Sequence, residues 1–145
     1  MPITIRPYAE SDNAAVVDLW ETVFPSAPPW NPPKDDIARK LKVQRELFLV
    51  ALVDDRLVGT VMAGYEGHRG WVNYLAVHPD YRRHGIGAAL MQRVEQDLTA
   101  LGCPKVNLQV RVGNEQVIAF YEKLGYQVEE RVSMGKLLRA NRRGE

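Results

Sequence analysis

The alternation of apolar and polar residues at the start of the chain predicts a short strand followed by a helix. Residues 3–6 alternate as in a strand, and helical spacing follows them. The apolar residues at helical spacing are Val16, Leu19, Trp20 and Val23. Ser11 or Asp12 is suited to cap this helix, and we expect it to stop at Pro25.

A second, more polar helix is predicted after the proline-rich stretch Pro25–Pro33. Its periodic positions are Ile37, Leu41 and Gln44. Two helices are therefore expected before the main sheet.

The middle of the chain has the pattern of a hairpin and a third strand. The apolar run Leu47–Val53 and the run Leu57–Met62 are separated by the polar turn 54–56, which contains two aspartates. A further strand, Trp71–Val77, follows the glycine-rich turn Gly67–Gly70. We expect these three strands to be neighbours in one sheet.

The longest helical pattern comes next. Its apolar positions are Ile86, Leu90, Val94, Leu98 and Leu101. They recur every three or four residues, which predicts an amphipathic helix, and Gly102 is suited to end it.

The last third of the chain predicts a strand, a short helix and another strand. Alternating apolar residues at Val106, Leu108 and Val110 indicate the first strand. The helix is indicated by Val117, Phe120, Tyr121 and Leu124, with Gly125 ending it. A last strand or hairpin is expected over Gln127–Leu138, and the polar tail Arg139–Glu145 is expected to be frayed surface.

Composition narrows the classes of protein to consider. The chain has 145 residues, 46% hydrophobic and 26% charged, which is typical of one globular domain. With 19 Lys and Arg against 18 Asp and Glu, the net charge of +1 gives no reason to expect nucleic acid as a partner. No leader pattern and no run of about 18 apolar residues is present. We therefore expect a cytoplasmic protein with no membrane partner.

Cysteine and histidine offer little support for a disulfide or a metal. Cys103 is the only cysteine, and its neighbours suggest a packed residue at a helix-to-strand junction. The histidines are His68, His78 and His84, and none has a second ligand at metal-binding spacing. No metal site is predicted.

The most informative stretch is 75–87, in which a strand leads through a Pro-Asp turn directly into the long helix. Gly85 and Gly87 lie where that helix begins. A helix start carries unpaired backbone N–H groups and a partial positive charge, so it binds phosphate where side chains leave room. The alternative is a purely structural role, in which the two glycines only permit a tight turn and close packing. The sequence lacks the lysine of a P-loop and the acidic ribose contact of a dinucleotide fold, so a nucleotide site has less support.

Two segments together resemble a known family. Residues 82–87 (Arg-Arg-His-Gly-Ile-Gly), after a strand and a Val-His-Pro, are similar to the acetyl-coenzyme A signature of the GNAT N-acetyltransferases. Residues 114–126, an Asn opening a helix that ends in Tyr-Glu-Lys-Leu-Gly-Tyr, resemble the second GNAT signature. The region Leu75–Gly125 is most similar to the RimI-like alanine N-acetyltransferases, and the whole chain to small YpeA-type acetyltransferases.

The resemblance implies the fold and the coenzyme site. It implies a single α/β (α+β) GNAT domain over residues 1–145, with 139–145 as a polar tail and about four helices flanking a mixed, mostly antiparallel twisted sheet. Acetyl-CoA would be the co-substrate, its pantetheine arm paired with the strand at 75–77 like an added strand. The implied coenzyme-binding residues are Leu75, Ala76, Val77, Arg82, Arg83, His84, Gly85, Ile86, Gly87, Ala88 and Asn114. Asn114 also has a plain structural role as a helix cap.

Tyr121 is the catalytic residue that the resemblance implies. A phenol near the thioester sulfur can donate a proton to the leaving thiolate. The alternative is a core aromatic beside Val117 and Leu124. The general base is unassigned, because Gln109 stands where RimI-like proteins have a carboxylate and Trp71 where another GNAT group has a glutamate. The remaining candidates are Glu66, Glu21 and a water relay.

The expected activity is transfer of the acetyl group to a primary amine by direct attack, without a covalent enzyme intermediate. The acceptor, either a protein N-terminus, a lysine or a small-molecule amine, is not identified. Trp30, Tyr65 and Trp71 are candidates to line its site. The alternative function is a coenzyme A-binding sensor or interaction module with little catalysis. Oligomeric state, a homodimer included, is left open by the sequence.

Overall fold

The computed structural model describes residues 1–25 and 32–138. The chain divides into two compact units, residues 1–109 and residues 110–145. Among the described residues, the first unit contains a sheet and three α-helices, and the second contains one α-helix. That the two units together form one domain over residues 1–145 stays a prediction.

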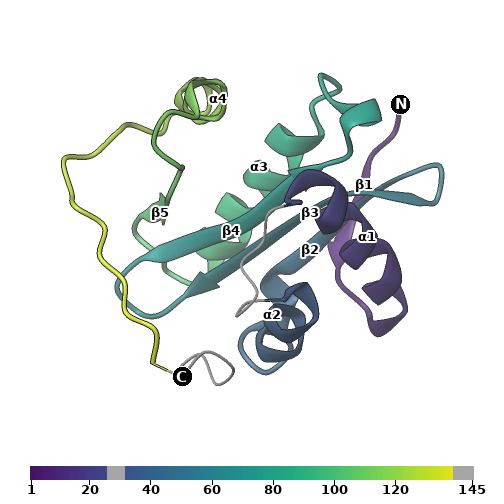
Figure 1. Ribbon diagram of the computed structural model, residues 1–145, viewed down its shortest axis with the longest axis horizontal. Coiled ribbons are helices and arrows are strands. Elements are labelled where there is room, and N and C mark those ends of the chain that lie inside the picture. Colours follow the sequence, from purple (N-terminus) through teal and green to yellow (C-terminus); the bar gives the residue numbers. More distant parts are fainter. Residues whose placement is uncertain (26–31, 139–145) are drawn as a thin grey trace. The chain divides into compact units, whose positions relative to one another are not determined.

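Five strands form one sheet in the order β1-β2-β3-β4-β5 (Figure 1). The strands are β1 (Thr4–Pro7), β2 (Phe48–Val53), β3 (Arg56–Tyr65), β4 (Gly70–Val77) and β5 (Val106–Leu108). Neighbours from β1 to β4 are antiparallel, and β5 runs parallel to β4. The helices of the described residues are α1 (Asn13–Val23), α2 (Pro33–Lys40), α3 (Ile86–Ala100) and α4 (Glu115–Lys123). The predicted α/β class with a mixed, mostly antiparallel sheet is confirmed.

The β2–β3 hairpin forms where the apolar runs and the aspartates predict it. Asp54 and Asp55 adopt φ angles of 51° and 62°, in the left-handed region. Two successive left-handed residues match the twist of the flanking strands, and aspartate tolerates this conformation better than most residues. The turn is therefore determined by local sequence.

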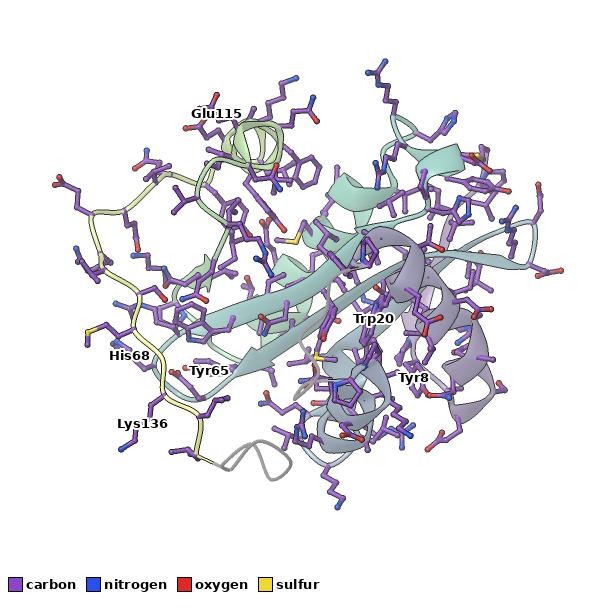
Figure 2. All side chains as sticks on the ribbon, viewed as in Figure 1. Tyr8, Trp20, Tyr65, His68, Glu115 and Lys136 are labelled. Atoms are coloured by element: carbon purple, nitrogen blue, oxygen red, sulfur yellow. The ribbon has the colours of Figure 1, made fainter. Side chains whose placement is uncertain are left out.

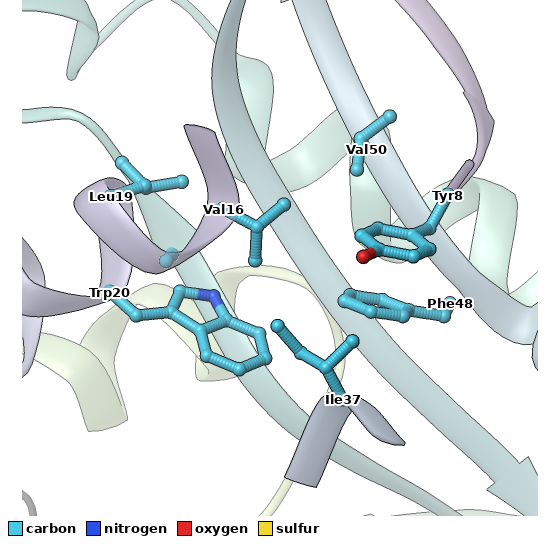
Figure 3. Close-up of a cluster of buried hydrophobic side chains, with 8 residues drawn as sticks. Tyr8, Val16, Leu19, Trp20, Ile37, Phe48 and Val50 are labelled. Carbon is cyan, nitrogen blue, oxygen red and sulfur yellow. The ribbon is translucent and has the colours of Figure 1, made fainter. Parts of the chain in front are cut away.

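Helices α1 and α2 cover one face of the sheet (Figure 1). The helical stripe of α1 brings Val16, Leu19 and Trp20 against the sheet, where Trp20 lies 5.9 Å from the Phe48 ring. Figure 3 shows Tyr8 stacked on Phe48. Their ring centroids are 4.7 Å apart. This aromatic cluster fixes α1 on β2 and β3.

Helix α3 covers the opposite face through Ile86, Leu90, Met91, Val94 and Leu98. Two glycines let it approach closely. A Cβ at Gly59 would lie 3.1 Å from Ile86 Cγ2, and a Cβ at Gly70 would lie 2.8 Å from Leu98 Cδ1. The start and the end of α3 therefore both pack closely against glycine backbone. This packing positions the helix start, which the sequence indicates as a phosphate site.

Two predictions for the N-terminal helices are corrected. Helix α2 ends at Lys40 rather than reaching Gln44, whose φ angle of 51° is left-handed. The Gln44 amide instead pairs with the backbone of Tyr65, accepting from its N–H at 2.8 Å and donating to its carbonyl at 3.1 Å. Asp12 precedes α1 but does not cap it through its side chain, because its carboxylate accepts from Arg6 and from the Ala9 N–H.

The C-terminal part differs most from its prediction. Strand β5 ends at Leu108, short of Val110. Helix α4 ends before Gly125, as predicted, and Gly125 has a left-handed φ of 98°. The predicted strand or hairpin over Gln127–Leu138 is wrong, since residues 127–138 form no strand. Alternation creates a strand only where another strand supplies hydrogen-bond partners, and no described strand pairs with this segment. Its apolar residues Val128, Val132 and Met134 are exposed.

Trp30 and the tail 139–145 lie outside the described residues, so the predictions made for them are not addressed. In the described part of the chain, none of the helices has the length and apolar character needed to cross a membrane.

Candidate functional site

The C-terminal half of β4 has an open edge. Strand β5 pairs only with Gly70, Trp71 and Val72. The N–H of His78 donates to the Val58 carbonyl at 2.8 Å, so hydrogen bonding to β3 occurs at position 78 and, by alternation, at Ala76. The backbone groups of Leu75 and Val77 therefore point to the other edge, where the described residues supply no strand.

A tight turn connects this edge to α3. His78 Nδ1 accepts the Asp80 N–H at 3.1 Å, which closes the short helical turn Pro79–Tyr81. The Arg56 guanidinium lies 5.4 Å from the centre of the Tyr81 ring and holds the turn to the β2–β3 hairpin. The contacts of His78 and Arg56 thus fix the direction in which the chain enters α3.

The start of α3 offers unpaired backbone donors. Gly85 occupies the N-cap with a left-handed φ of 79° and provides no side-chain cap. The first helical hydrogen bond runs from the Ala89 N–H to the Gly85 carbonyl at 2.9 Å, so the N–H groups of Ile86, Gly87 and Ala88 have no acceptor within the helix. Gly85 is exposed, and nothing lies within 4 Å of where its Cβ would be. The helix start is open to a ligand.

Basic side chains surround these donors. Arg82, Arg83 and His84 are exposed, and Arg83 has a left-handed φ of 67° that turns the backbone into the helix. Arg82 Nε donates to the Val77 carbonyl at 3.4 Å, which leaves the other guanidinium N–H groups for an anion. The predicted coenzyme-binding residues from Leu75 to Ala88 therefore lie together on one strand–turn–helix segment. Its chemistry suits an extended ligand that ends in phosphate.

Asn114 caps α4, as its structural alternative predicts. Its Oδ1 accepts the Val117 N–H at 3.4 Å. The Nδ2 group keeps two donor hydrogens. The cap explains the residue structurally and leaves its predicted coenzyme contact as a prediction.

Tyr121 lies on α4 among other aromatic rings. It is buried, with the Phe120 ring at 5.0 Å and the Tyr126 ring at 5.6 Å, both edge-on. Burial raises the pKa of Tyr121 to about 12. The phenol therefore stays protonated at neutral pH and can donate a hydrogen bond or a proton.

The carboxylate candidates for the base have different surroundings. Glu66 Oε1 accepts the N–H groups of His68 and Arg69, each at 2.6 Å, in the β3–β4 turn. These backbone hydrogen bonds, that of Arg69 above all, hold the pKa of Glu66 below its usual range, so it is a weaker base than an ordinary glutamate. Glu21 is an exposed residue of α1, and Gln109 directly follows β5. The assignment of the base stays open.

The candidate acceptor residues Tyr65 and Trp71 lie near the β3–β4 turn. The Tyr65 hydroxyl donates to the Gly67 carbonyl at 3.3 Å, and Figure 2 shows Tyr65 and His68 at that end of the hairpin. Trp71 on β4 is 39% exposed, a large apolar surface for one side chain. Their role in acceptor binding stays a prediction.

Cys103 packs at the junction between α3 and β5. Its Sγ donates to the Lys105 carbonyl at 3.3 Å and lies 3.0 Å from where a Cβ of Gly70 would be. Its place at the helix-to-strand junction is as predicted, but the residue is half-buried where a buried one was expected. Among residues 1–25 and 32–138, no three His, Cys, Asp or Glu side chains gather as metal ligands would.

Sequence reasoning missed a bulge in β4 and the residues around it. Between Asn73 and Ala76, two residues of β4, Tyr74 and Leu75, face the single residue Val61 of β3. Tyr74 has a left-handed φ of 54°, unusual for a bulky side chain. The signal in the sequence is weak: the adjacent pair Tyr74-Leu75 interrupts the alternation of the predicted strand.

Comparison with known proteins gives the class. Residues 13–126 match the Acetyltransferase (GNAT) family, and the chain belongs to it. An acetyltransferase from Pectobacterium atrosepticum is 49% identical over 134 residues, which cover 92% of this chain and 94% of that protein. The chain is thus an acyltransferase of GNAT type.

Solved structures share the fold. The ribosomal-protein-S18-alanine N-acetyltransferase from Escherichia coli matches with a TM-score of 0.71 and 25% identity, over 86% of this chain and 77% of that one. AAC(6')-Iy, solved in complex with the bisubstrate analog CoA-S-monomethyl-acetylneamine, matches with a TM-score of 0.77 and 17% identity, over 94% and 99%.

Proposed function

We propose that this chain transfers the acetyl group of acetyl-CoA to a primary amine, with the coenzyme bound along the β4 edge and the start of α3. The observation that carries the proposal is the open edge at Leu75 and Val77 leading into the uncapped start of α3. The pantetheine arm contains amides that can pair with this edge as a strand would. Its pyrophosphate would accept from the N–H groups of Ile86, Gly87 and Ala88, helped by the helix dipole.

Further side chains would contribute to binding the coenzyme. Arg82, Arg83 and His84 would add charge-assisted contacts to phosphate oxygens. Gly85 would keep the approach free of side-chain atoms. Asn114 would donate from Nδ2 while its Oδ1 caps α4. Ala76 contributes to the same strand but bonds toward β3.

Tyr121 would protonate the leaving thiolate. The neutral amine attacks the thioester carbonyl carbon, the carbon–sulfur bond breaks, and the sulfur takes up a proton from the phenol. The proton that the amine nitrogen loses would pass through water and restore the phenol. A pKa of about 12 keeps that proton available throughout the neutral range. Holding amine and thioester together supplies much of the rate, and Cys103 takes no part.

The acceptor remains a class rather than a compound: a protein N-terminus, a lysine or a small-molecule amine. The similarity to YpeA-type acetyltransferases, a cytoplasmic location and a homodimer are likewise proposals. The exposed Trp71 supports an acceptor that carries some apolar surface beside its amine.

The test is a panel of primary amines incubated with acetyl-CoA and the purified chain. Release of free thiol is followed together with the mass of each amine. We expect thiol release to match acetylated amine in amount for at least one class of acceptor. Tight acetyl-CoA binding with no amine acetylated in any class would instead favour a coenzyme sensor. Absence of acetyl-CoA binding would contradict both functions.

A further inference from the structure

The bulge in β4 lies where the open coenzyme edge begins. Pairing with β5 ends at Val72, and the extra residue of β4 falls two positions later at Tyr74–Leu75. A bulge bends its strand and increases the local twist, so it turns the end of β4 away from β5. The backbone that would pair with acetyl-CoA, at Leu75 and Val77, follows directly.

A buried hydroxyl fixes the bulge from the β3 side. The Thr60 hydroxyl donates to the Tyr74 carbonyl at 3.0 Å and accepts from Trp20 Nε1 at 2.9 Å. Thr60 and Trp20 are both buried. Tyr74 has a left-handed φ at this bulge, and the Thr60 hydroxyl supplies its carbonyl with a hydrogen-bond donor from a neighbouring side chain.

The Tyr74 side chain is held separately on the α1 and α2 face. Its ring stacks on Trp20 with centroids 3.8 Å apart. Its hydroxyl donates to Asp36 Oδ2 at 2.6 Å, and Asp36 Oδ1 accepts from Arg39 at 2.7 Å. Tyr74 is thus anchored by its carbonyl through Thr60 and by its phenol through Asp36. A strained residue persists only where its surroundings determine its conformation.

We propose that Thr60, assisted by Asp36, is a positioning residue that holds the β4 bulge and thereby aims the backbone of Leu75 and Val77 at acetyl-CoA. The inference rests on the proposed function. Neither residue would touch the coenzyme. Without the hydroxyl, the half-buried Tyr74 carbonyl loses the donor that holds it, and the strand can relax toward regular pairing. A shift of one residue in register would turn the backbone groups of Leu75 and Val77 toward β3.

The test compares Thr60→Val with Thr60→Ser. Valine keeps the shape of threonine without the hydroxyl, and serine keeps the hydroxyl. Acetyl-CoA affinity is measured by calorimetry on the full chain, and melting temperature is recorded for each variant. We expect Thr60→Val to bind acetyl-CoA at least about fivefold more weakly, because the Tyr74 carbonyl loses the hydroxyl that holds the bulge. We expect Thr60→Ser to remain within about twofold of the unmodified chain.

Tyr8→Phe is the matched control for general loss of stability. It removes a hydroxyl that donates to Asn13 at 3.3 Å in the same core, away from the bulge. We expect it to lower the melting temperature without changing acetyl-CoA affinity. A folded Thr60→Val with unchanged affinity would overturn the inference, as would an equal loss in Tyr8→Phe. An unmodified chain that does not bind acetyl-CoA would instead overturn the proposed function on which the inference rests.

If Thr60→Val does not fold, variants of the second anchor, the hydrogen bond from the Tyr74 hydroxyl to Asp36, test the inference instead. Asp36→Ala removes the acceptor of the Tyr74 hydroxyl, while Arg39→Ala removes the neighbouring charge and leaves that hydrogen bond in place. We expect weaker acetyl-CoA binding for Asp36→Ala alone. Equal affinities for Asp36→Ala, Arg39→Ala and the unmodified chain would contradict the role of the anchored bulge.

Discussion

The segment from β4 to α3 and the segment 110–138 offer different kinds of groups for the proposed function. From β4 to α3, the groups offered to a ligand are backbone N–H and C=O, held by a sheet, a turn and a helix that are packed on both sides. In residues 110–138, they are the side chains of Asn114 and Tyr121 on one short helix. Most substitutions leave backbone donors and acceptors in place, whereas a single substitution can remove a side-chain group.

The difference predicts how each segment responds to mutation. Replacing a side chain from β4 to α3 rarely removes a backbone donor, so it acts by blocking space or adding charge. Replacing Tyr121 would remove the proposed acid and should leave binding intact. Binding and turnover should therefore separate between the two segments.

The largest effect is expected for Tyr121→Phe. It removes one hydroxyl from a buried ring and keeps the shape, so acetyl-CoA affinity and stability should change little. Loss of a general acid should lower turnover by about 10²- to 10⁴-fold, with little change in the Michaelis constant for acetyl-CoA. Steady-state kinetics with a responsive amine measure both.

Tyr126→Phe is the matched control, because it removes a hydroxyl from the neighbouring ring, 5.6 Å away. Its turnover should stay within a few-fold of the unmodified chain. If Tyr121→Phe also stays within a few-fold, Tyr121 is a core aromatic and has no catalytic part.

The next largest effect is expected for Gly87→Glu. The new carboxylate would stand beside the first-turn N–H groups of α3, where it repels the pyrophosphate and fills its place. Acetyl-CoA affinity should fall by at least about 100-fold, equivalent to about 2.7 kcal/mol. A negative side chain in the first turn favours the helix, so the fold should survive. Calorimetry and circular dichroism measure the two quantities.

Gln96→Glu places the same charge on an exposed position of the same helix, away from its start. It should bind acetyl-CoA nearly as tightly as the unmodified chain. A folded Gly87→Glu with undiminished affinity would remove the helix start from the coenzyme site.

The last prediction concerns pH rather than a substitution. The free amine is the nucleophile, so turnover should rise up to about tenfold per pH unit until the acceptor amine loses its proton. That limit lies near pH 8 for an α-amine and above about pH 10 for a lysine, which helps to identify the acceptor. Tyr121, with a pKa of about 12, should cause no loss of rate below that pH. A fall in turnover between pH 8 and 10 in a folded chain would contradict its role as the acid.

Much of the first segment could be predicted from sequence, because its signals are local. Spacing of apolar residues determines α3, and Gly85 with its left-handed φ starts the helix where the motif indicates. The bulge at Tyr74 could not be predicted, since its carbonyl is satisfied by Thr60, which lies 14 residues earlier in the chain. Contacts of this kind have no local pattern.

For the second segment, residues 110–138, less could be predicted from the sequence. Asn114 caps α4 as its residue type predicts. The strand or hairpin predicted over residues 127–138 did not form, because a local pattern does not specify a strand partner. Glu66 was a candidate base because of its position alone. The structure shows that its Oε1 accepts two backbone N–H groups, which gives it a structural role in the turn.

The most direct test of where acetyl-CoA binds is backbone amide hydrogen exchange with and without the coenzyme. The amides of Leu75 and Val77 and those of Ile86, Gly87 and Ala88 have no acceptor within their strand or helix, so they should exchange quickly in the free chain and slow markedly with acetyl-CoA. Amides near Gln96, on the same helix, should change little. Slowed exchange elsewhere with no change at these five amides, in a chain that binds acetyl-CoA, would contradict the proposed site.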